Sequence, residues 1–285
     1  MTIRLIFNMA LAMALAATLA FAQMKPKSQK EYDAILAVQN SAEPDARIAA
    51  VESLLAKYAD TEFKGWALMM AAASAQQKND FEKMVIYAER TLEADPKSFQ
   101  AMLMLSSGLA QRTREFDLDK EEKLTRADKL ANQAIEVLKV APKPNPQFPD
   151  AQWEAAKKDS VSQAHETLGQ AAFVRKKYDL AAQEWKTAID GAASPDPATM
   201  VRLANAYNQM NKPDEAIAML DKLNSVAEVH PQIKSAAAEM RNTSIKLKGA
   251  GAAKPAATPA ATPAPTGLAP TPSPSPSPVP TAPKP

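Results

Sequence analysis

The sequence predicts an all-α fold, a solenoid of antiparallel helix pairs stacked side by side. The first observation is the stretch 164–189. Its small and large residues occupy the positions that two short antiparallel helices in close contact require. Gly169 lies inside the first of these helices at a cost of roughly 1 kcal/mol against alanine, so a close helix contact is expected there. The second observation is that the same order recurs 35 residues later, at Ala204. A repeat of this length is typical of α-solenoids.

The two clearest repeats span residues 162–195 and 197–230. Their matching positions are Leu168, Gly169, Ala181, Trp185 and Ala188 in the first and Leu203, Ala204, Tyr207 and Ala216 in the second. This order of leucine, small residue, aromatic and alanine resembles the tetratricopeptide repeat (TPR) family. The first repeat departs from the family pattern at Ala172, where the family favours tyrosine, and at Ala193, where it favours proline. The resemblance implies a TPR-like superhelix whose first helices line a concave wall.

Weaker copies fill the rest of the folded region, predicted as residues 23–248. Helices are expected over 29–39 and 44–58, then 66–78 and 81–94, where Asp95-Pro96 ends the pair. A further first helix is expected over 99–112, and the last helix, from Pro231 to about Leu247, would cap the solenoid. The prediction is therefore about five helix pairs plus a capping helix.

Two departures from the repeat length stand out. Residues 117–126 are inserted before the second helix of the third pair, where Asp119 and Glu122 resemble a capping box and predict a helix that runs to about Val140. Asp150 is expected to cap a first helix of about twice the usual length in the fourth pair. The two extensions should project from opposite edges. Trp153 on the second extension either folds back on the 142–149 loop or contacts another chain.

Both ends of the chain are expected to lie outside the fold. Residues 1–22 have a basic start, an apolar run and the small residues Ala20 and Ala22, which predict a signal peptide cleaved between Ala22 and Gln23. The alternative is an uncleaved membrane anchor, since the apolar run is near the ~18 residues that can span a membrane. Residues 249–285, rich in proline, alanine, serine and threonine, predict a disordered tail. It would serve as a spacer or, alternatively, as a ligand for a proline-binding groove.

Composition argues against most chemistry. The chain has no cysteine and two histidines, and it shows neither a phosphate-binding glycine loop nor a metal-ligand cluster. His165 is expected to pack against the second helix of its pair, and His230 to lie in a turn. The net charge of +2 gives no basic field for nucleic acid. We therefore expect no enzyme activity, no cofactor, no metal and no nucleic-acid partner, in a periplasmic or secreted compartment.

A binding surface is the remaining candidate. The resemblance places it on the first helices, where it is apolar and methionine-rich toward the N-terminus and amide-rich toward the C-terminus, which suits an apolar helix or an extended peptide. Ser107, Gln111 and Glu166 are expected on the same wall. The candidate residues are Trp66, Met69, Met70, Leu103, Met104, Gln163, Gln170, Phe173, Arg202, Asn205, Asn208 and Gln209. The alternative for Met69 and Met70 is packing between repeats.

The family members that clamp a peptide carboxylate place lysine, asparagine and arginine on successive first helices. Only Arg202 and Asn205 match that set here, and Glu166 would repel a carboxylate, so a carboxylate clamp is disfavoured. The sequence predicts a non-enzymatic protein-interaction module of the bacterial cell envelope. The alternatives are an envelope-assembly or cell-wall scaffold, tethered through the tail or an uncleaved signal, and an enzyme accessory protein.

Overall fold

The computed structural model describes residues 24–144, 146–226 and 228–252, and these form eleven α-helices with no strand among them. In chain order the helices are α2 (Gln29–Asn40), α3 (Pro44–Lys57), α4 (Lys64–Gln77), α5 (Phe81–Ala94), α6 (Phe99–Arg112), α7 (Lys120–Val140), α8 (Asp150–Val174), α9 (Tyr178–Gly191), α10 (Pro197–Gln209), α11 (Pro213–Asn224) and α12 (Pro231–Ala252).

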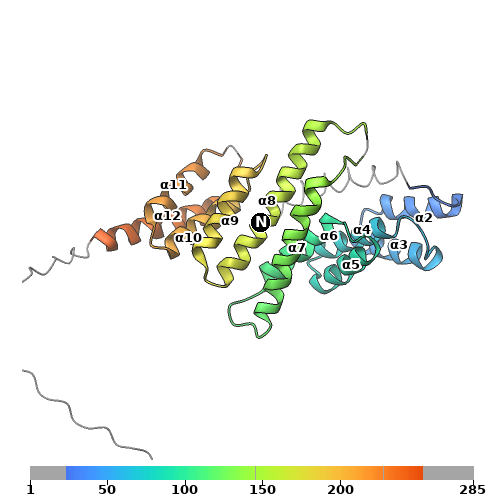
Figure 1. Cartoon of the computed structure of the whole chain (residues 1–285), viewed down its shortest axis with the longest axis horizontal. Coiled ribbons are helices and arrows are strands. Elements are labelled where there is room, and N and C mark those ends of the chain that lie inside the picture. The colour runs from blue at the N-terminus through green and yellow to red at the C-terminus, as the bar shows by residue number, and fades with distance from the viewer. Residues whose placement is uncertain (1–23, 145, 227, 253–285) are drawn as a thin grey trace, which may run out of the picture.

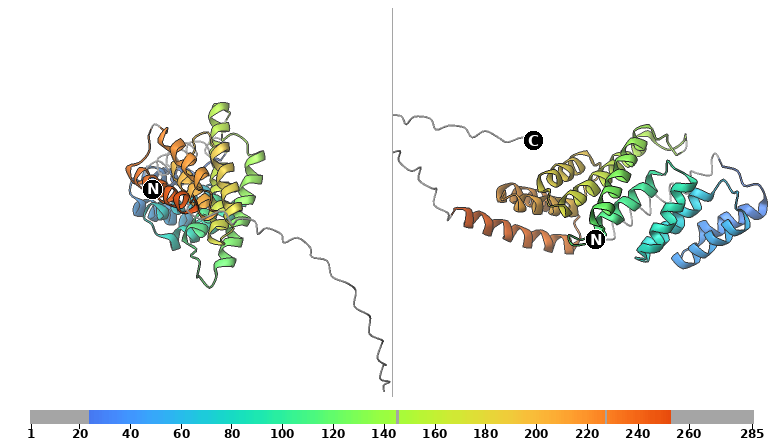
Figure 2. Two further views of the ribbon diagram at one scale, coloured as in Figure 1. Left: turned by 90° about the vertical axis from the view of Figure 1, so that its left-hand side faces the viewer. Right: turned by 60° about the horizontal axis from the view of Figure 1, so that its bottom comes forward.

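Consecutive helices pack as antiparallel pairs, and each pair packs on the next (Figure 1). The pairs are α2–α3, α4–α5, α6–α7, α8–α9 and α10–α11, and α12 packs on both helices of the last pair. Figure 2 shows the pairs following one another along the length of the molecule. First helices also contact one another across pairs, as α6 does with α8. The predicted all-α solenoid is confirmed.

The turn within three of the pairs repeats one backbone conformation. Asn79, Lys176 and Asn211 have φ values of 59°, 62° and 56°, and each lies two residues before the second helix of its pair. The residue after each donates its N–H to a carbonyl five residues back, as Lys177 does to Ala172 at 2.9 Å. This is the Schellman type of helix end, which needs a left-handed residue. The conformation fixes how each first helix returns into its partner.

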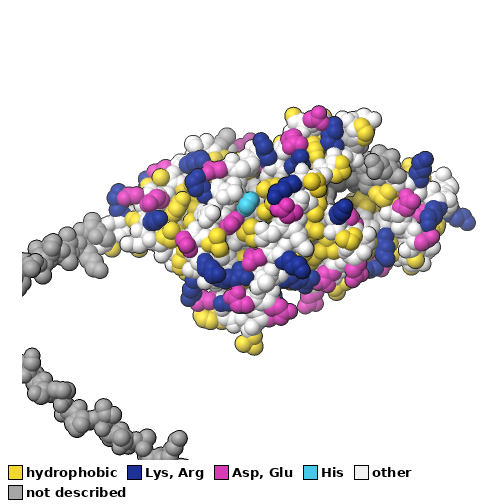
Figure 3. All heavy atoms as spheres, in the orientation of Figure 1, with side chains coloured by type: hydrophobic (Ala, Val, Ile, Leu, Met, Phe, Trp, Pro, Cys, Tyr) yellow, Lys and Arg dark blue, Asp and Glu magenta, His cyan; other side chains and the backbone are white. Residues whose placement is uncertain are grey.

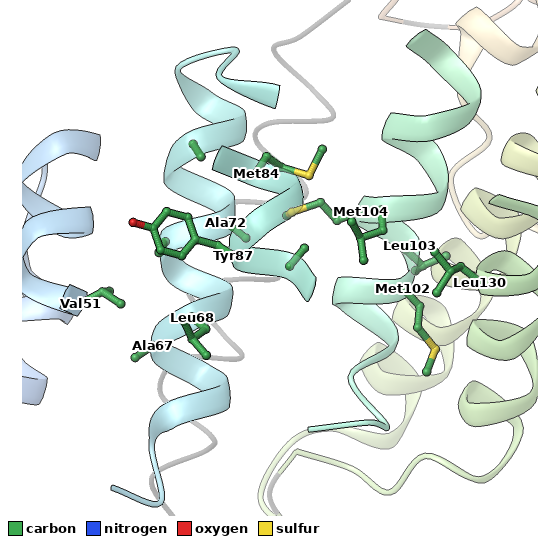
Figure 4. Packing of buried hydrophobic residues seen from close by; sticks show 14 of the residues in the cluster. Val51, Ala67, Leu68, Ala72, Met84, Tyr87, Met102, Leu103, Met104 and Leu130 are labelled. Atoms are coloured by element: carbon green, nitrogen blue, oxygen red, sulfur yellow. The ribbon is translucent and has the colours of Figure 1, made fainter. Parts of the chain in front are cut away.

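The buried apolar residues form two clusters that meet on α8. The first runs from α2 to Ala164 of α8, and the second runs from Ala172 of α8 to α12. Figure 4 shows part of the first cluster, with Leu103 of α6 beside Leu130 of α7 and Met104 directed toward Met84 of α5. Because α8 contributes to both clusters, it holds the two halves of the solenoid together.

The lengthened helices project from opposite edges of the solenoid, as the sequence predicts (Figure 1). The first-helix extension is confirmed, since α8 has 25 residues against 14 for α4. Asp119 occupies the N-cap position of α7, as predicted, but the side-chain hydrogen bonds of the two proposed caps are not formed. Asp119 makes no side-chain cap hydrogen bond and pairs with Lys123 at 2.9 Å, and Asp150 is the first helical residue, paired with Lys143 at 2.6 Å.

Trp153 lies half-buried on the α8 extension, with the Lys157 ammonium 6.0 Å from its ring centroid. It belongs to neither apolar cluster. Its expected contact with the 142–149 loop, or with another chain, stays a prediction.

The C-terminal helix is longer than the sequence suggested. α12 continues to Ala252, so the first four residues of the segment 249–285 are helical rather than disordered. The remainder of that segment and the predicted signal peptide 1–22 lie outside the described residues. Within the described ranges, no helix combines the length and the apolar character needed to cross a membrane.

Candidate functional site

Three successive first helices line one narrow hollow, here called the first-helix hollow, and most of its lining residues are polar. On α8, four residues at helical spacing share a face that opens into it, because positions three, four and seven apart lie along one side of a helix. The lining residues are Ser107, Ala110 and Gln111 from α6, Gln163, Glu166, Thr167 and Gln170 from α8, and Asp196 and Arg202 from the start of α10.

The packing of α9 fixes the position of that face. The indole of Trp185 lies against Gly169, where an added Cβ would come within 2.6 Å of ring atoms Cδ1 and Nε1. The same indole donates a hydrogen bond of 3.2 Å to the carbonyl oxygen of Glu166. One turn earlier, the Ser162 hydroxyl donates to the carbonyl oxygen of Ala188 at 2.7 Å. The close helix contact that the sequence predicts at Gly169 is made by this indole.

Glu166 is the electrostatic centre of the hollow. Burial raises the pKa of its carboxyl to about 7, and the nearby negative charges of Asp196 and Asp159 act in the same direction. The positive charge of Arg202 and a hydrogen bond from Thr199 oppose this rise. Near pH 7 the group is therefore poised between its neutral and charged forms, so it changes from hydrogen-bond donor to acceptor there.

The start of α10 supplies the other charges. Asp196 caps the helix by accepting a hydrogen bond of 3.0 Å from the Ala198 N–H. Its second carboxylate oxygen lies 3.9 Å from Nη1 of Arg202, which also donates to the Thr199 hydroxyl at 3.2 Å. Arg202 is thus held beside the mouth of the hollow by its own helix.

Only some of the residues predicted for the concave wall lie together in the structure. Gln163, Gln170 and Arg202 line the first-helix hollow together with Ser107, Gln111 and Glu166, which the sequence had placed on the same wall. Asp196 and Thr167 were missed. Asp196 carried a signal that could have been used, because it precedes Pro197 at a helix start.

Several predicted wall residues are packed inside the protein instead. Leu103 and Met104 are 4% and 2% exposed, so they are removed from the accessible wall (Figure 4). Asn208 is buried, and its amide nitrogen lies 3.3 Å from the Met240 sulfur of α12. Phe173 is half-buried and packs on Tyr178 and Trp185 with centroid distances of 5.2 and 5.5 Å. These four side chains hold helices together.

The remaining predicted residues lie apart from the hollow. Trp66, Met69 and Met70 are half-buried and pack on the first apolar cluster, which agrees with the packing alternative for the two methionines. Asn205 is half-buried and Gln209 exposed on α10, and neither lines the hollow.

A second hollow lies on the other side of α8, between α7 and α9. Arg175 lines this second hollow, here called the outer hollow. It forms ion pairs with Glu121 and Asp128 of α7 at 2.9 and 2.8 Å. At its edge, His165 Nδ1 lies 2.7 Å from the Glu184 carboxylate of α9, as expected for a histidine that packs on its partner helix. These contacts tie α8 to its neighbours on both sides.

Charge is mixed over the molecular surface. On the face seen in Figure 3, basic and acidic side chains are interspersed and no large area carries one sign. Among the described residues, no group of three or more histidine and acidic side chains is arranged to hold a metal ion.

No family model and no curated protein sequence matches the chain. Solved structures are similar to it in fold. A thermophilic TPR protein from Thermus thermophilus is 18% identical, with 69% of this chain and 90% of that chain covered and a TM-score of 0.48. A MamA double mutant (RS-1) is 12% identical, with 80% and 100% covered and a TM-score of 0.49. A TPR protein from Parabacteroides merdae is 13% identical, with 79% and 90% covered and a TM-score of 0.38.

The packing of the chain itself defines the repeat. In the α8–α9 pair, a large aromatic residue of the second helix covers a glycine of the first, and the left-handed turn between them recurs 35 residues later, from Lys176 to Asn211. The chain has a TPR-type fold. In this TPR arrangement the first helices of successive pairs share one side of the superhelix, and that is where α6, α8 and α10 form the hollow.

Proposed function

We propose that the chain is a non-enzymatic protein-binding module that holds a peptide or protein segment against its first helices. The observation that carries the proposal is the first-helix hollow, which three successive pairs build together. Its three glutamine amides, together with Ser107 and Thr167, can donate to and accept from a peptide backbone. An extended segment gains its affinity from such main-chain hydrogen bonds.

The compartment is part of the same proposal. The basic start, the apolar run and the small residues at 20 and 22 support export, with the mature chain beginning at Gln23. We place the module in the bacterial cell envelope, in the periplasm or outside the cell. N-terminal sequencing of the protein from its host envelope tests this directly, because a chain that still begins at Met1 would contradict cleavage.

Affinity capture from envelope extract tests binding in the hollow. The bait is the mature chain, and the variant Gln163→Ala/Gln170→Ala removes two amides from the hollow. The matched control Gln133→Ala/Gln183→Ala removes two amides from exposed positions on α7 and α9. We expect the control to recover the same partner as the parent and the hollow variant to recover much less. Equal recovery by both variants would place the binding surface elsewhere.

A further inference from the structure

The first-helix hollow holds more negative than positive charge. Glu166 and Asp196 line it, Asp159 adds its field from one helical turn before the hollow, and Arg202 is the basic residue in the lining. The lining residues of α6 are Ser107, Ala110 and Gln111, which carry no charge. With all three carboxyls ionised, Arg202 balances only one of them.

The two aspartates are already engaged in holding the backbone. Asp159 Oδ1 accepts hydrogen bonds from the N–H groups of Ala193 and Ser194 at 2.8 and 3.0 Å. Asp196 caps α10 through the Ala198 N–H. Both aspartate carboxylates therefore stabilise the backbone beside the hollow. Glu166 is the acidic residue on the face of α8 that lines it.

The surroundings of Glu166 disfavour its negative charge even though Arg202 is near. Burial is the largest cause, and the charge of Asp196 comes next. Burial opposes a charge of either sign, but the negative charge of Asp196, which disfavours a second anion beside it, attracts a cation placed between the two carboxylates. The amides of Gln163 and Gln170 lie one turn to either side of Glu166 on α8 and line the same hollow, so they can hydrogen-bond the backbone of a peptide that carries the cation.

We propose that the first-helix hollow receives a lysine or arginine side chain of the bound peptide, with Glu166 as the direct counter-ion. This inference rests on the proposed function and names the class of residue that the hollow selects. It agrees with the expectation from the sequence that a carboxylate clamp is disfavoured, since a peptide carboxylate would face both Glu166 and Asp196. Binding of the cation lowers the pKa of Glu166 and releases a proton when the complex forms near pH 7.

Selection of random heptapeptides displayed on phage, at pH 8 against the purified mature chain, tests the proposal. We expect the selected peptides to share one lysine or arginine. In a synthetic copy of the best peptide, replacing that residue by norleucine should weaken binding by about tenfold or more. This change is made on the peptide, so it needs no variant protein to fold.

The variant Glu166→Gln should weaken binding of the basic peptide by a similar factor and leave the norleucine peptide almost unaffected. The exposed Glu122→Gln of α7 is the matched control for loss of one negative charge, and it should bind both peptides like the parent. Calorimetry at pH 7 in two buffers of different ionisation enthalpy should show proton release with the parent and none with Glu166→Gln.

The outcomes separate the two proposals. Peptides that depend on Gln163 and Gln170 but show no basic preference, or that prefer acidic residues, would overturn the cation site and leave the binding function standing. Failure to select any peptide, or selection of peptides insensitive to all hollow variants, would overturn both.

Discussion

Gly169 is a residue whose missing side chain matters more than its conformation. The indole of Trp185 occupies the place of a Cβ, at 2.6 Å, while no described glycine has a positive φ. Gly169→Ala should therefore destabilise the protein by ~1–3 kcal/mol through overpacking, despite the better helix propensity of alanine.

Gly191 provides the matched control, because a Cβ there meets no atom within 4 Å. Gly191→Ala is expected to be neutral or slightly stabilising. Urea unfolding of both variants measures the difference, and an equal effect of the two changes would show that the Trp185 contact is wrong.

Glu166 makes stability depend on pH in a predictable direction. Its folded pKa of about 7 lies above the ordinary 4.5, so the folded state holds a proton that the unfolded state releases. The stability contribution is fully present below pH 4.5 and is lost as the pH rises through 7. Since the group is partly exposed, we expect a loss of roughly 2 kcal/mol.

Glu166→Gln should remove this slope and be more stable than the parent at pH 8. Unfolding curves at several pH values between 4.5 and 8 provide the measurement, with Glu122→Gln as the control for charge. A slope that persists unchanged in Glu166→Gln would assign it to another group.

At the scale of the element, the turn between α8 and α9 requires a left-handed residue, and Lys176 has φ 62° there. Lys176→Asn should be neutral or stabilising, because asparagine occupies this position in the two other turns of the same type. Lys176→Val should cost ~1–3 kcal/mol, because a β-branched residue is strained in that conformation. Both changes remove the exposed ion pair with Glu115, so its loss cancels in the comparison. Thermal melting of the two variants checks the prediction, and equal midpoints would contradict the assigned turn.

Sequence patterns were informative where one helix has one buried face. The two antiparallel helices that carry Gly169 and Trp185 follow from local spacing. The pattern failed on α6, which contacts α5, α7 and α8 and buries every residue from Ala101 to Ser106. This half of α6 is buried on all sides and has no stripe from which to identify an open face, so Leu103 and Met104 were assigned to the wall.

Contacts between residues that are far apart in the sequence could not be predicted from sequence patterns. Asp196 lies 30 residues from Glu166, and its effect on that carboxyl arises from the approach of α10 to α8. The side-chain caps expected of Asp119 and Asp150 are not formed either; Asp119 pairs with Lys123 one turn along the same helix, and Asp150 pairs with Lys143 of the preceding loop.

At the scale of the whole molecule, the solenoid has two apolar clusters joined by one long helix. The same helix carries Gln163, Glu166 and Gln170, so the binding face is attached to the element that connects both halves. A ligand that contacts α6, α8 and α10 together therefore bridges pairs that otherwise pack only as neighbours.

Hydrogen exchange of the mature chain, with and without the peptide selected at pH 8, tests the location of the binding face most directly. Bound peptide should slow exchange of amides on α6, α8 and α10, because binding stabilises closed forms of the elements that it contacts. Amides on the outer helices α7 and α9 should change much less. Protection concentrated on α7 and α9, with the first helices unchanged, would move the site to the outer hollow and contradict the account.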